Sequence, residues 1–228
     1  MKIKWLGHSA FMIENKKKIV IDPFLTGNPK SAMKAADIKC DIVVVTHGHG
    51  DHMGDALLIA KKNNALFVST YELANYASSK GVKKTEGINI GGTLRTDGVE
   101  ISMVQAMHSS GLSSENFRID GGISTGVIIK DGKSVYHTGD TGVFFDMKLV
   151  QKLYEPEIML LPIDGHFNMN YKAAAMAVEF VKPEYAIPMH YDTFPLIEVN
   201  PQDFAREVKK LHPDTKVVVM NPGQEINI

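Results

Sequence analysis

The segment from Thr46 to His52 holds the densest group of ligand-type side chains in the chain. Its sequence, Thr-His-Gly-His-Gly-Asp-His, places three imidazoles and one carboxylate within six residues. Neutral imidazole binds zinc, iron, nickel or copper, and a carboxylate adds a hard, charged ligand. The two glycines permit sharp backbone turns, so His47 and His49 can face one ion while Asp51 and His52 face another. The alternative is a solvated polar loop with coincidental histidines, which the alternation of ligands with glycine disfavours.

This segment directly follows an apolar run, Asp41–Thr46, that predicts a fully buried strand. Other short runs rich in branched or aromatic residues predict further strands, and longer capped segments predict helices. The other expected strands are 2–6, 10–14, 18–22, 65–69, 99–106, 126–130, 134–138, 158–162, 186–189 and 216–220. The expected helices are 55–62, 70–79, 171–181 and 201–211, and the glycine-rich stretch 109–122 is the longest expected loop.

Both halves of the chain run from antiparallel strands into alternating strands and helices. This order predicts two sheets packed face to face with helices outside, in one domain over residues 1–228. A chain of 228 residues with 44% hydrophobic and 22% charged residues is typical of a soluble globular protein. We find no linker and no appended module.

Charge and cysteine content exclude several classes of protein. The formal charge of −1 gives no overall attraction to nucleic acid or anionic membranes. The single cysteine, Cys40, rules out an internal disulfide and a four-thiolate zinc site, and its place beside an apolar run predicts a buried, inert thiol. No stretch has the length of a membrane span, and the first residues lack a signal-peptide core. We therefore expect a cytoplasmic location, and homo-oligomerisation is left open.

At the Thr46–His52 segment the chain resembles the metallo-β-lactamase superfamily, whose hallmark is H-x-H-x-D-H after a strand. Later residues fit the same family order: His108 after an apolar strand, Asp140 in His-Thr-Gly-Asp-Thr and His190 in Ile-Pro-Met-His. The resemblance covers essentially the whole chain and implies an α/β fold, the αββα four-layer sandwich. It also implies a binuclear centre whose ligands are His47, His49, Asp51, His52, His108, Asp140 and His190, with Asp140 bridging. Zinc is the favoured metal, and manganese, iron or nickel suits the same ligands.

Two features of the sequence exclude particular branches of the superfamily. His49 stands where the flavo-diiron branch has a glutamate, and Cys40 precedes the motif, which excludes the branch with a cysteine ligand. Shorter motifs resemble a short prokaryotic branch described as metal-dependent hydrolases, similar to ascorbate-phosphate lactonases and phosphodiesterase-like members. These motifs are Gly7-His8-Ser9-Ala10-Phe11, Asp22-Pro23-Phe24 and the segment 162–170.

Several residues are candidates for roles around the metals. Asp22 is expected to orient a ligand histidine, or else to cap the turn before Pro23. His8 and Tyr191 are candidate substrate contacts, with a hydrogen bond in the turn and packing as the respective alternatives. His166 is a candidate general acid. Asn168 is a candidate substrate contact or cap, and Asp164 has the same two alternatives.

The resemblance implies hydrolysis by a hydroxide shared between two ions, with Asp51 or His166 handling protons. Small phosphodiesters are the favoured substrates, and lactones or other esters are the alternative. A different class of function is a non-catalytic metal-binding sensor or scaffold, which the complete ligand set disfavours. The expected partner is therefore a small-molecule substrate.

Overall fold

The computed structural model describes residues 1–113 and 118–228, and in this part of the chain the strands form two seven-stranded mixed sheets. The first sheet has the order β16 (Glu225–Asn227), β1 (Lys2–Gly7), β2 (Ala10–Glu14), β3 (Lys18–Ile21), β4 (Ile42–Val44), β5 (Leu66–Ser69) and β6 (Thr85–Gly87). The second has the order β15 (Lys216–Val217), β14 (Tyr185–Met189), β13 (Ile158–Pro162), β12 (Lys133–His137), β11 (Thr125–Asp131), β8 (Val99–Gln105) and β7 (Thr93–Thr96).

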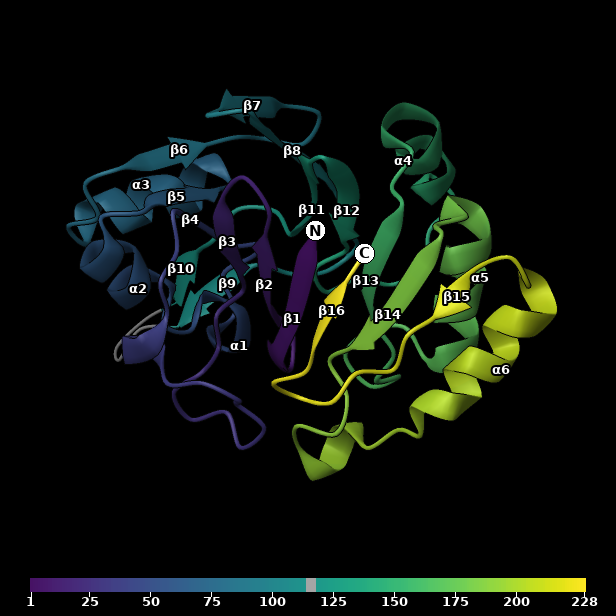
Figure 1. Cartoon of the computed structure of the whole chain (residues 1–228). Coiled ribbons are helices and arrows are strands. Elements are labelled where there is room, and N and C mark those ends of the chain that lie inside the picture. The colour runs from purple at the N-terminus through teal and green to yellow at the C-terminus, as the bar shows by residue number, and fades with distance from the viewer. Residues whose placement is uncertain (114–117) are drawn as a thin grey trace.

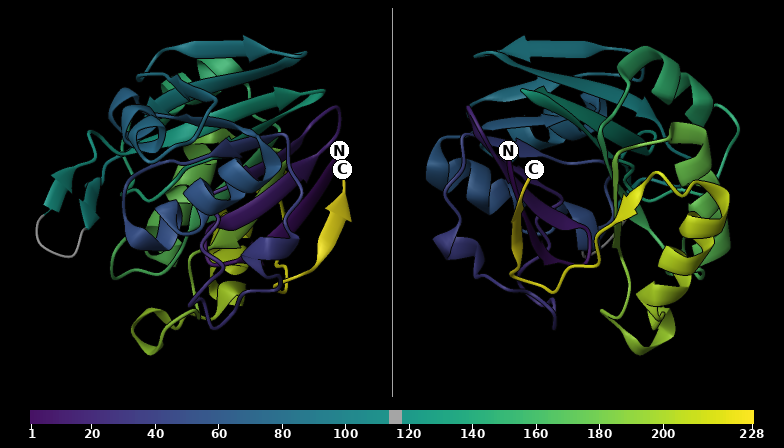
Figure 2. Two further views of the ribbon diagram at one scale, coloured as in Figure 1. Left: turned by 90° about the vertical axis from the view of Figure 1, so that its left-hand side faces the viewer. Right: turned by 45° about the vertical axis from the view of Figure 1, so that its right-hand side comes forward.

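Helices cover the outer face of each sheet (Figure 1). The first sheet is covered by α2 (Ala56–Asn63) and α3 (Tyr71–Ser79), and the second by α4 (Met147–Tyr154), α5 (Tyr171–Val181) and α6 (Pro201–Leu211). Figure 2 shows the same layers from two further directions, with the two chain ends side by side. The ends meet because β16 pairs antiparallel with β1. The predicted αββα four-layer sandwich is confirmed.

The alternation of side chains along each strand supplies two hydrophobic layers. Ile19 and Ile21 of β3 point into the layer between the sheets, whereas Val20 between them packs with the helices on the outer face. Each of these side chains is fully buried. Burial of a side chain of this size is worth roughly 1.5–3 kcal/mol. The strand β3 is therefore packed on both faces of its sheet.

Three expectations about the elements need correction. The stretch 109–122, expected as a loop, contains an antiparallel pair, β9 (Gly111–Ser113) and β10 (Arg118–Asp120), and residues 114–117 lie outside the described residues. The last expected strand, 216–220, ends already at Val217. A short helix, α1 (Gly50–Met53), begins inside the histidine-rich segment, outside the expected helices.

Two further features bear on the expectations from composition. Cys40 is half-buried, and burial raises the pKa of its thiol to about 12. Among the described residues, none of the helices combines the length and apolar character that a membrane crossing requires.

Candidate metal centre

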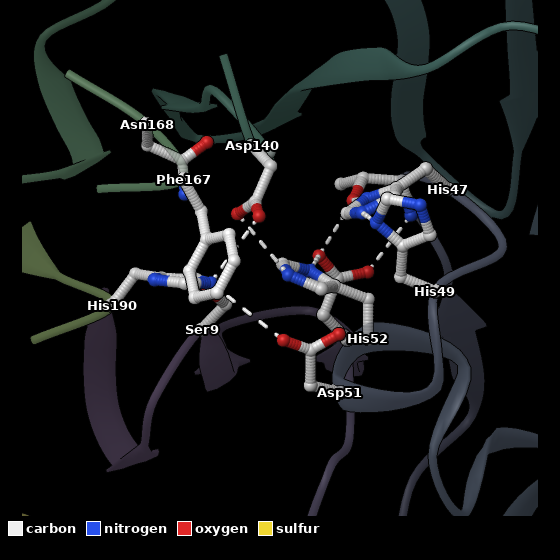
Figure 3. A network of polar contacts seen from close by, with 12 residues as sticks. Ser9, His47, His49, Asp51, His52, Asp140, Phe167, Asn168 and His190 are labelled. Atoms are coloured by element: carbon white, nitrogen blue, oxygen red, sulfur yellow. Dashed lines mark hydrogen bonds and ion pairs between the residues drawn. The ribbon is translucent and has the colours of Figure 1, made fainter. Parts of the chain in front are cut away.

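The predicted ligands gather at one edge of the two sheets, in four segments that each follow the end of a strand. These strands are β4, β8, β12 and β14, and the ligands that follow them are His47 to His52, His108, Asp140 and His190 respectively. The strands β12, β13 and β14 run parallel, so their carboxyl ends open at the same edge. Figure 3 shows the labelled side chains of His47, His49, Asp51, His52, Asp140 and His190 turned toward one another at this edge. Residues that are up to 143 positions apart in the sequence therefore form one cluster.

One group of ring nitrogens is formed by His47, His49 and His108. Their nitrogens lie within 4.8 Å of one another. Nε2 of His47 is 3.0 Å from Nδ1 of His49, and the His108 ring stands edge-on to both. Burial and the nearby His52 lower the pKa of His47 well below its usual range. Burial likewise lowers the pKa of His108. Both imidazoles are therefore held in the neutral form that binds metals.

A second group is formed by Asp51, His52 and His190, together with His8. Nε2 of His190 lies 3.8 Å from Oδ2 of Asp51, and Nε2 of His8 lies 3.2 Å from the same oxygen. His52 and His190 are buried, whereas the side chain of Asp51 is 35% exposed. Asp51 is therefore the member of this group that a substrate can reach.

Asp140 lies between the two groups. One carboxylate oxygen is 3.1 Å from Nε2 of His52, and the other is 3.2 Å from Nε2 of His190 and 3.6 Å from Nε2 of His108. Burial raises the pKa of this carboxyl, but His190 and His52 outweigh it and hold the pKa well below its usual range. Asp140 is thus an ionised carboxylate that reaches histidines of both groups.

These donors fit divalent metal ions. Nε2 of His52 and Nε2 of His190 are buried and lie 3.1 and 3.2 Å from the carboxylate oxygens of Asp140, but neither contact has the geometry of a hydrogen bond. Unpaired buried polar atoms are costly and call for a partner. Burial lowers the pKa of His52, but Asp140 and Asp22 raise it well above its usual range, and Asp140 similarly raises that of His190 to about 10. The buried carboxylates thus favour positive charge at this site, either on the histidines or on a bound cation. A ligand set of imidazole and carboxylate suits zinc, manganese, iron or nickel.

Carboxylates also contact Nδ1 of two candidate ligand histidines, the ring nitrogen other than the one that faces Asp140. Oδ2 of Asp22 is 2.8 Å from Nδ1 of His52, and Asp22 in turn accepts hydrogen bonds from the backbone N–H and the hydroxyl of Thr46. Oδ2 of Asp164 is 3.1 Å from Nδ1 of His190. Such contacts fix the tautomer and the ring angle of a ligand. Asp22 lies beside a candidate ligand histidine, as expected, whereas the contact between Asp164 and His190 was not expected.

His8 and Tyr191 occupy positions that differ from the expected substrate contacts. Only 1% of His8 is exposed, and its ring lies 3.9 Å from that of His190. Both of its ring nitrogens have protein partners, Thr193 and Asp51. Tyr191 is 6% exposed and stacks on Trp5 at 5.4 Å between ring centroids. Tyr191 therefore belongs to the core packing, and His8 lies against the ligands instead of in the open part of the site.

His166 and Asn168 lie on the segment between β13 and α5. The side chain of His166 is exposed and its ring packs edge-on against Phe167 at 4.6 Å. Asn168 is half-buried and donates from Nδ2 to Oδ2 of Asp164. In Figure 3, Phe167 and Asn168 stand beside Asp140 and His190. The roles of His166 as an acid and of Asn168 as a substrate contact stay predictions.

Comparison with known proteins agrees with this arrangement of ligands. The model of a β-lactamase superfamily domain matches residues 2–190. A UPF0173 metal-dependent hydrolase of Methanopyrus kandleri is 50% identical over 226 residues, which cover 98% of each chain. One of Archaeoglobus fulgidus is also 50% identical over 226 residues, covering 98% of this chain and 97% of the relative. The chain belongs to the metallo-β-lactamase superfamily. Within this superfamily it is a UPF0173 protein.

Solved structures of the superfamily share the fold. Igni18, a metallo hydrolase from the hyperthermophilic archaeon Ignicoccus hospitalis, is 41% identical with a TM-score of 0.89, covering 99% of this chain and 97% of that chain. An isothiocyanate hydrolase from Delia radicum gut bacteria has a TM-score of 0.76 at 19% identity, over 100% of this chain and 99% of that chain. At that identity the likeness extends to the fold alone.

Proposed function

We propose that this protein is a metal-dependent hydrolase that uses two divalent ions, with zinc favoured, to cleave small phosphodiesters. The observation that carries the proposal is the convergence of the buried nitrogen and oxygen atoms of His52, Asp140 and His190, which contact one another without hydrogen-bond geometry, beside the three histidines of the first group. Membership of the metallo-β-lactamase superfamily and relatives described as metal-dependent hydrolases support the metal-dependent hydrolysis in this proposal.

In this proposal each group of donors would hold one of the two ions. His47, His49 and His108 would hold the first ion, and Asp51, His52 and His190 the second, while Asp140 reaches toward both. Two divalent ions bound there would lower the pKa of a water molecule to near neutrality and stabilise negative charge on the substrate.

The residues of the chain would handle substrate orientation and protons. Burial raises the pKa of Asp51, but the contact with His8 and the charge of His52 hold it below its usual range. Asp51 is therefore an ionised acceptor with an exposed side, which suits it to accept a hydrogen bond from an attacking water molecule and so to orient it. Asp22 and Asp164 would keep the rings of His52 and His190 aimed at their ions.

Lactones and other uncharged esters are the second candidate substrates. The feature that favours them is the aromatic rim of the site, where Phe24 and Phe194 lie edge-on to His8 at 5.8 and 6.0 Å and Phe167 is 53% exposed. Such a rim suits an apolar organic group next to the bond that is cleaved.

An activity screen with defined metal loading tests the proposal. Metal-free protein is reconstituted separately with zinc, manganese, iron(II) and nickel and assayed on bis(4-nitrophenyl) phosphate, cyclic nucleotides, lactones and thioesters. We expect about two ions per chain, and the fastest metal-dependent turnover on a phosphodiester. Asp140→Ala serves as the inactive control, and Asp146→Ala, at an exposed carboxylate outside the ligand set, as the matched one.

Three results would overturn this reading in different ways. Folded protein that binds no metal refutes the metal centre itself. Protein that binds two ions and hydrolyses lactones but no phosphodiester moves the assignment to the second candidate. Protein that binds two ions and hydrolyses none of the substrates favours the metal-binding sensor.

A further inference from the structure

His8 is the one member of the second ligand group that the superfamily motif does not include. It lies in the turn between β1 and β2, far from the other members in the sequence. Its Nδ1 is 2.8 Å from Oγ1 of Thr193, and its Nε2 is 3.2 Å from Oδ2 of Asp51. The three side chains thus form a continuous chain of polar contacts, from the segment after β14 to the exposed carboxylate of the site.

The chemistry of the partners fixes the direction of both hydrogen bonds. An ionised carboxylate only accepts, so the proton between His8 and Asp51 belongs to Nε2 of His8. A neutral imidazole with a proton on Nε2 has a lone pair on Nδ1, and the Thr193 hydroxyl must donate to it. The other acceptor near this hydroxyl, the carbonyl oxygen of Tyr191, is 3.5 Å away, which is long for a hydrogen bond.

The backbone around His8 holds the ring in this position. His8 has a φ of 55°, in the left-handed region that non-glycine residues adopt only at a cost of roughly 1–3 kcal/mol. Its carbonyl oxygen accepts from the backbone N–H of His190 and from Nε1 of Trp5, at 3.1 and 2.9 Å. The preceding Gly7 has a φ of 106°, and a Cβ atom there would lie 2.5 Å from the carbonyl oxygen of Lys30. The two hydrogen bonds to the His8 carbonyl and the close approach of Lys30 to Gly7 therefore fix the turn, with the imidazole directed at Asp51.

We propose that His8 is a positioning residue for Asp51: its Nε2–H holds Oδ2 of the carboxylate, and Thr193 fixes the tautomer that makes this possible. The inference rests on the proposed function in one respect, namely that Asp51 is a ligand of the second ion. Asp51 is the most exposed carboxylate of the ligand set, with 35% of its side chain accessible, and would otherwise sample several rotamers. His8 removes that freedom and presents the carboxylate to the second group in one orientation.

A pair of substitutions at His8 separates this role from simple packing. Glutamine places an N–H donor near the position of Nε2, whereas leucine fills the space without a donor. We expect His8→Leu to weaken binding of the second ion by roughly 10–100-fold, the usual effect of losing a residue that orients a ligand. Binding of the first ion, held by His47, His49 and His108, should be nearly unchanged. His8→Gln should recover most of the lost affinity. The readout is a two-site metal-binding isotherm.

A second pair at Thr193 tests the tautomer and does not alter the histidine. Thr193→Val removes the hydroxyl with little change of shape, and Thr193→Ser keeps it. We expect the valine variant to weaken the second ion by a smaller factor than His8→Leu and the serine variant to resemble the native protein. In the native protein without metal, nitrogen NMR of the imidazoles should show His8 protonated on Nε2. This measurement does not depend on metal affinity or on activity.

Several outcomes would overturn the inference. One is equal loss of the second ion in His8→Gln and His8→Leu, which would make the imidazole itself a ligand. Others are unchanged affinity in His8→Leu, equal weakening of both ions, or a proton found on Nδ1 in the native protein. If His8→Leu does not fold, the Thr193 pair and the NMR measurement decide. Failure of the proposed function would look different, because the native protein itself would then bind no second ion.

Discussion

Oδ2 of Asp164 lies 3.1 Å from Nδ1 of His190, while Oδ1 of the same carboxylate accepts hydrogen bonds from three successive backbone N–H groups. These N–H groups belong to His166, Phe167 and Asn168. The Asp164 side chain therefore both closes the turn after β13 and contacts the ring of His190. The two functions use different oxygen atoms. They can therefore be separated by substitution.

Asp164→Asn should impair metal binding more than folding. Asparagine retains an Oδ1 acceptor for the three backbone donors but places a neutral amide against His190 and Asn168. We expect affinity for the second ion to fall roughly 10–100-fold, with a small change in the free energy of unfolding. Asp164→Ala should lose the same affinity and also destabilise the protein by about 1–3 kcal/mol, because three partly buried backbone donors lose their acceptor. Metal titration and denaturant unfolding measure the two effects, and equal unfolding free energies in both variants would contradict the turn-closing role.

The contact between Asp164 and His190 could in principle have been predicted from the pairing of two strands. Pro162 of β13 is in register with Met189 of β14, and the two strands run parallel, so the residues that follow them emerge at the same edge. The sequence predicts both strands but not that they are neighbours. An aspartate before a glycine is also a common turn residue, and this simpler explanation suits Asp164 equally well in isolation.

Asp140→Ala should weaken binding at both metal positions, whereas His108→Ala should chiefly weaken the first. The reason is geometric, because the Asp140 oxygens lie 3.1 to 3.6 Å from histidines of both groups and His108 belongs to the first group alone. Asp140→Ala also removes the negative charge between two cations. Elemental analysis after titration distinguishes the sites, with Asp146→Ala as the control. A His108→Ala protein that loses both ions while Asp140→Ala keeps them would reverse these roles.

Cys40 should react slowly and with an unusual pH dependence. Burial raises the pKa of its thiol to about 12, so the reactive thiolate is scarce at neutral pH and its share grows as pH rises toward that value. We expect alkylation of the folded protein by iodoacetamide to accelerate roughly tenfold per pH unit from pH 8 to 10, without a plateau. The unfolded chain, with an ordinary thiol pKa of about 8.5, should level off near pH 9. A plateau near pH 9 in folded protein, checked by circular dichroism, would show that the thiol is not shielded.

The parts of the molecule that the sequence did not reveal depend on contacts between distant residues. β16 is only three residues long, and it forms by pairing with β1 at the opposite end of the chain. His8 reaches Asp51 from 43 residues away, and no local pattern predicts which turn will meet the ligand segment. The candidate ligands were predictable because the His-Gly-His-Gly-Asp-His segment supplies four of them at fixed spacing, and because the other three fit the order of the superfamily that the chain resembles.

His166→Ala tests whether this exposed histidine protonates a leaving group. Its backbone N–H is already held by Asp164, and its ring packs on Phe167, so loss of the imidazole should change stability by less than about 0.5 kcal/mol. Metal content should remain that of the native protein. Turnover should fall by roughly 10²–10⁴ for substrates with poor leaving groups, the usual worth of a positioned acid. The loss should shrink for 4-nitrophenolate, which departs without a proton. His212→Ala, outside the ligand cluster, is the matched control. Equal losses with good and poor leaving groups would remove His166 from the reaction, since a histidine that only shapes the rim affects binding of both substrates alike.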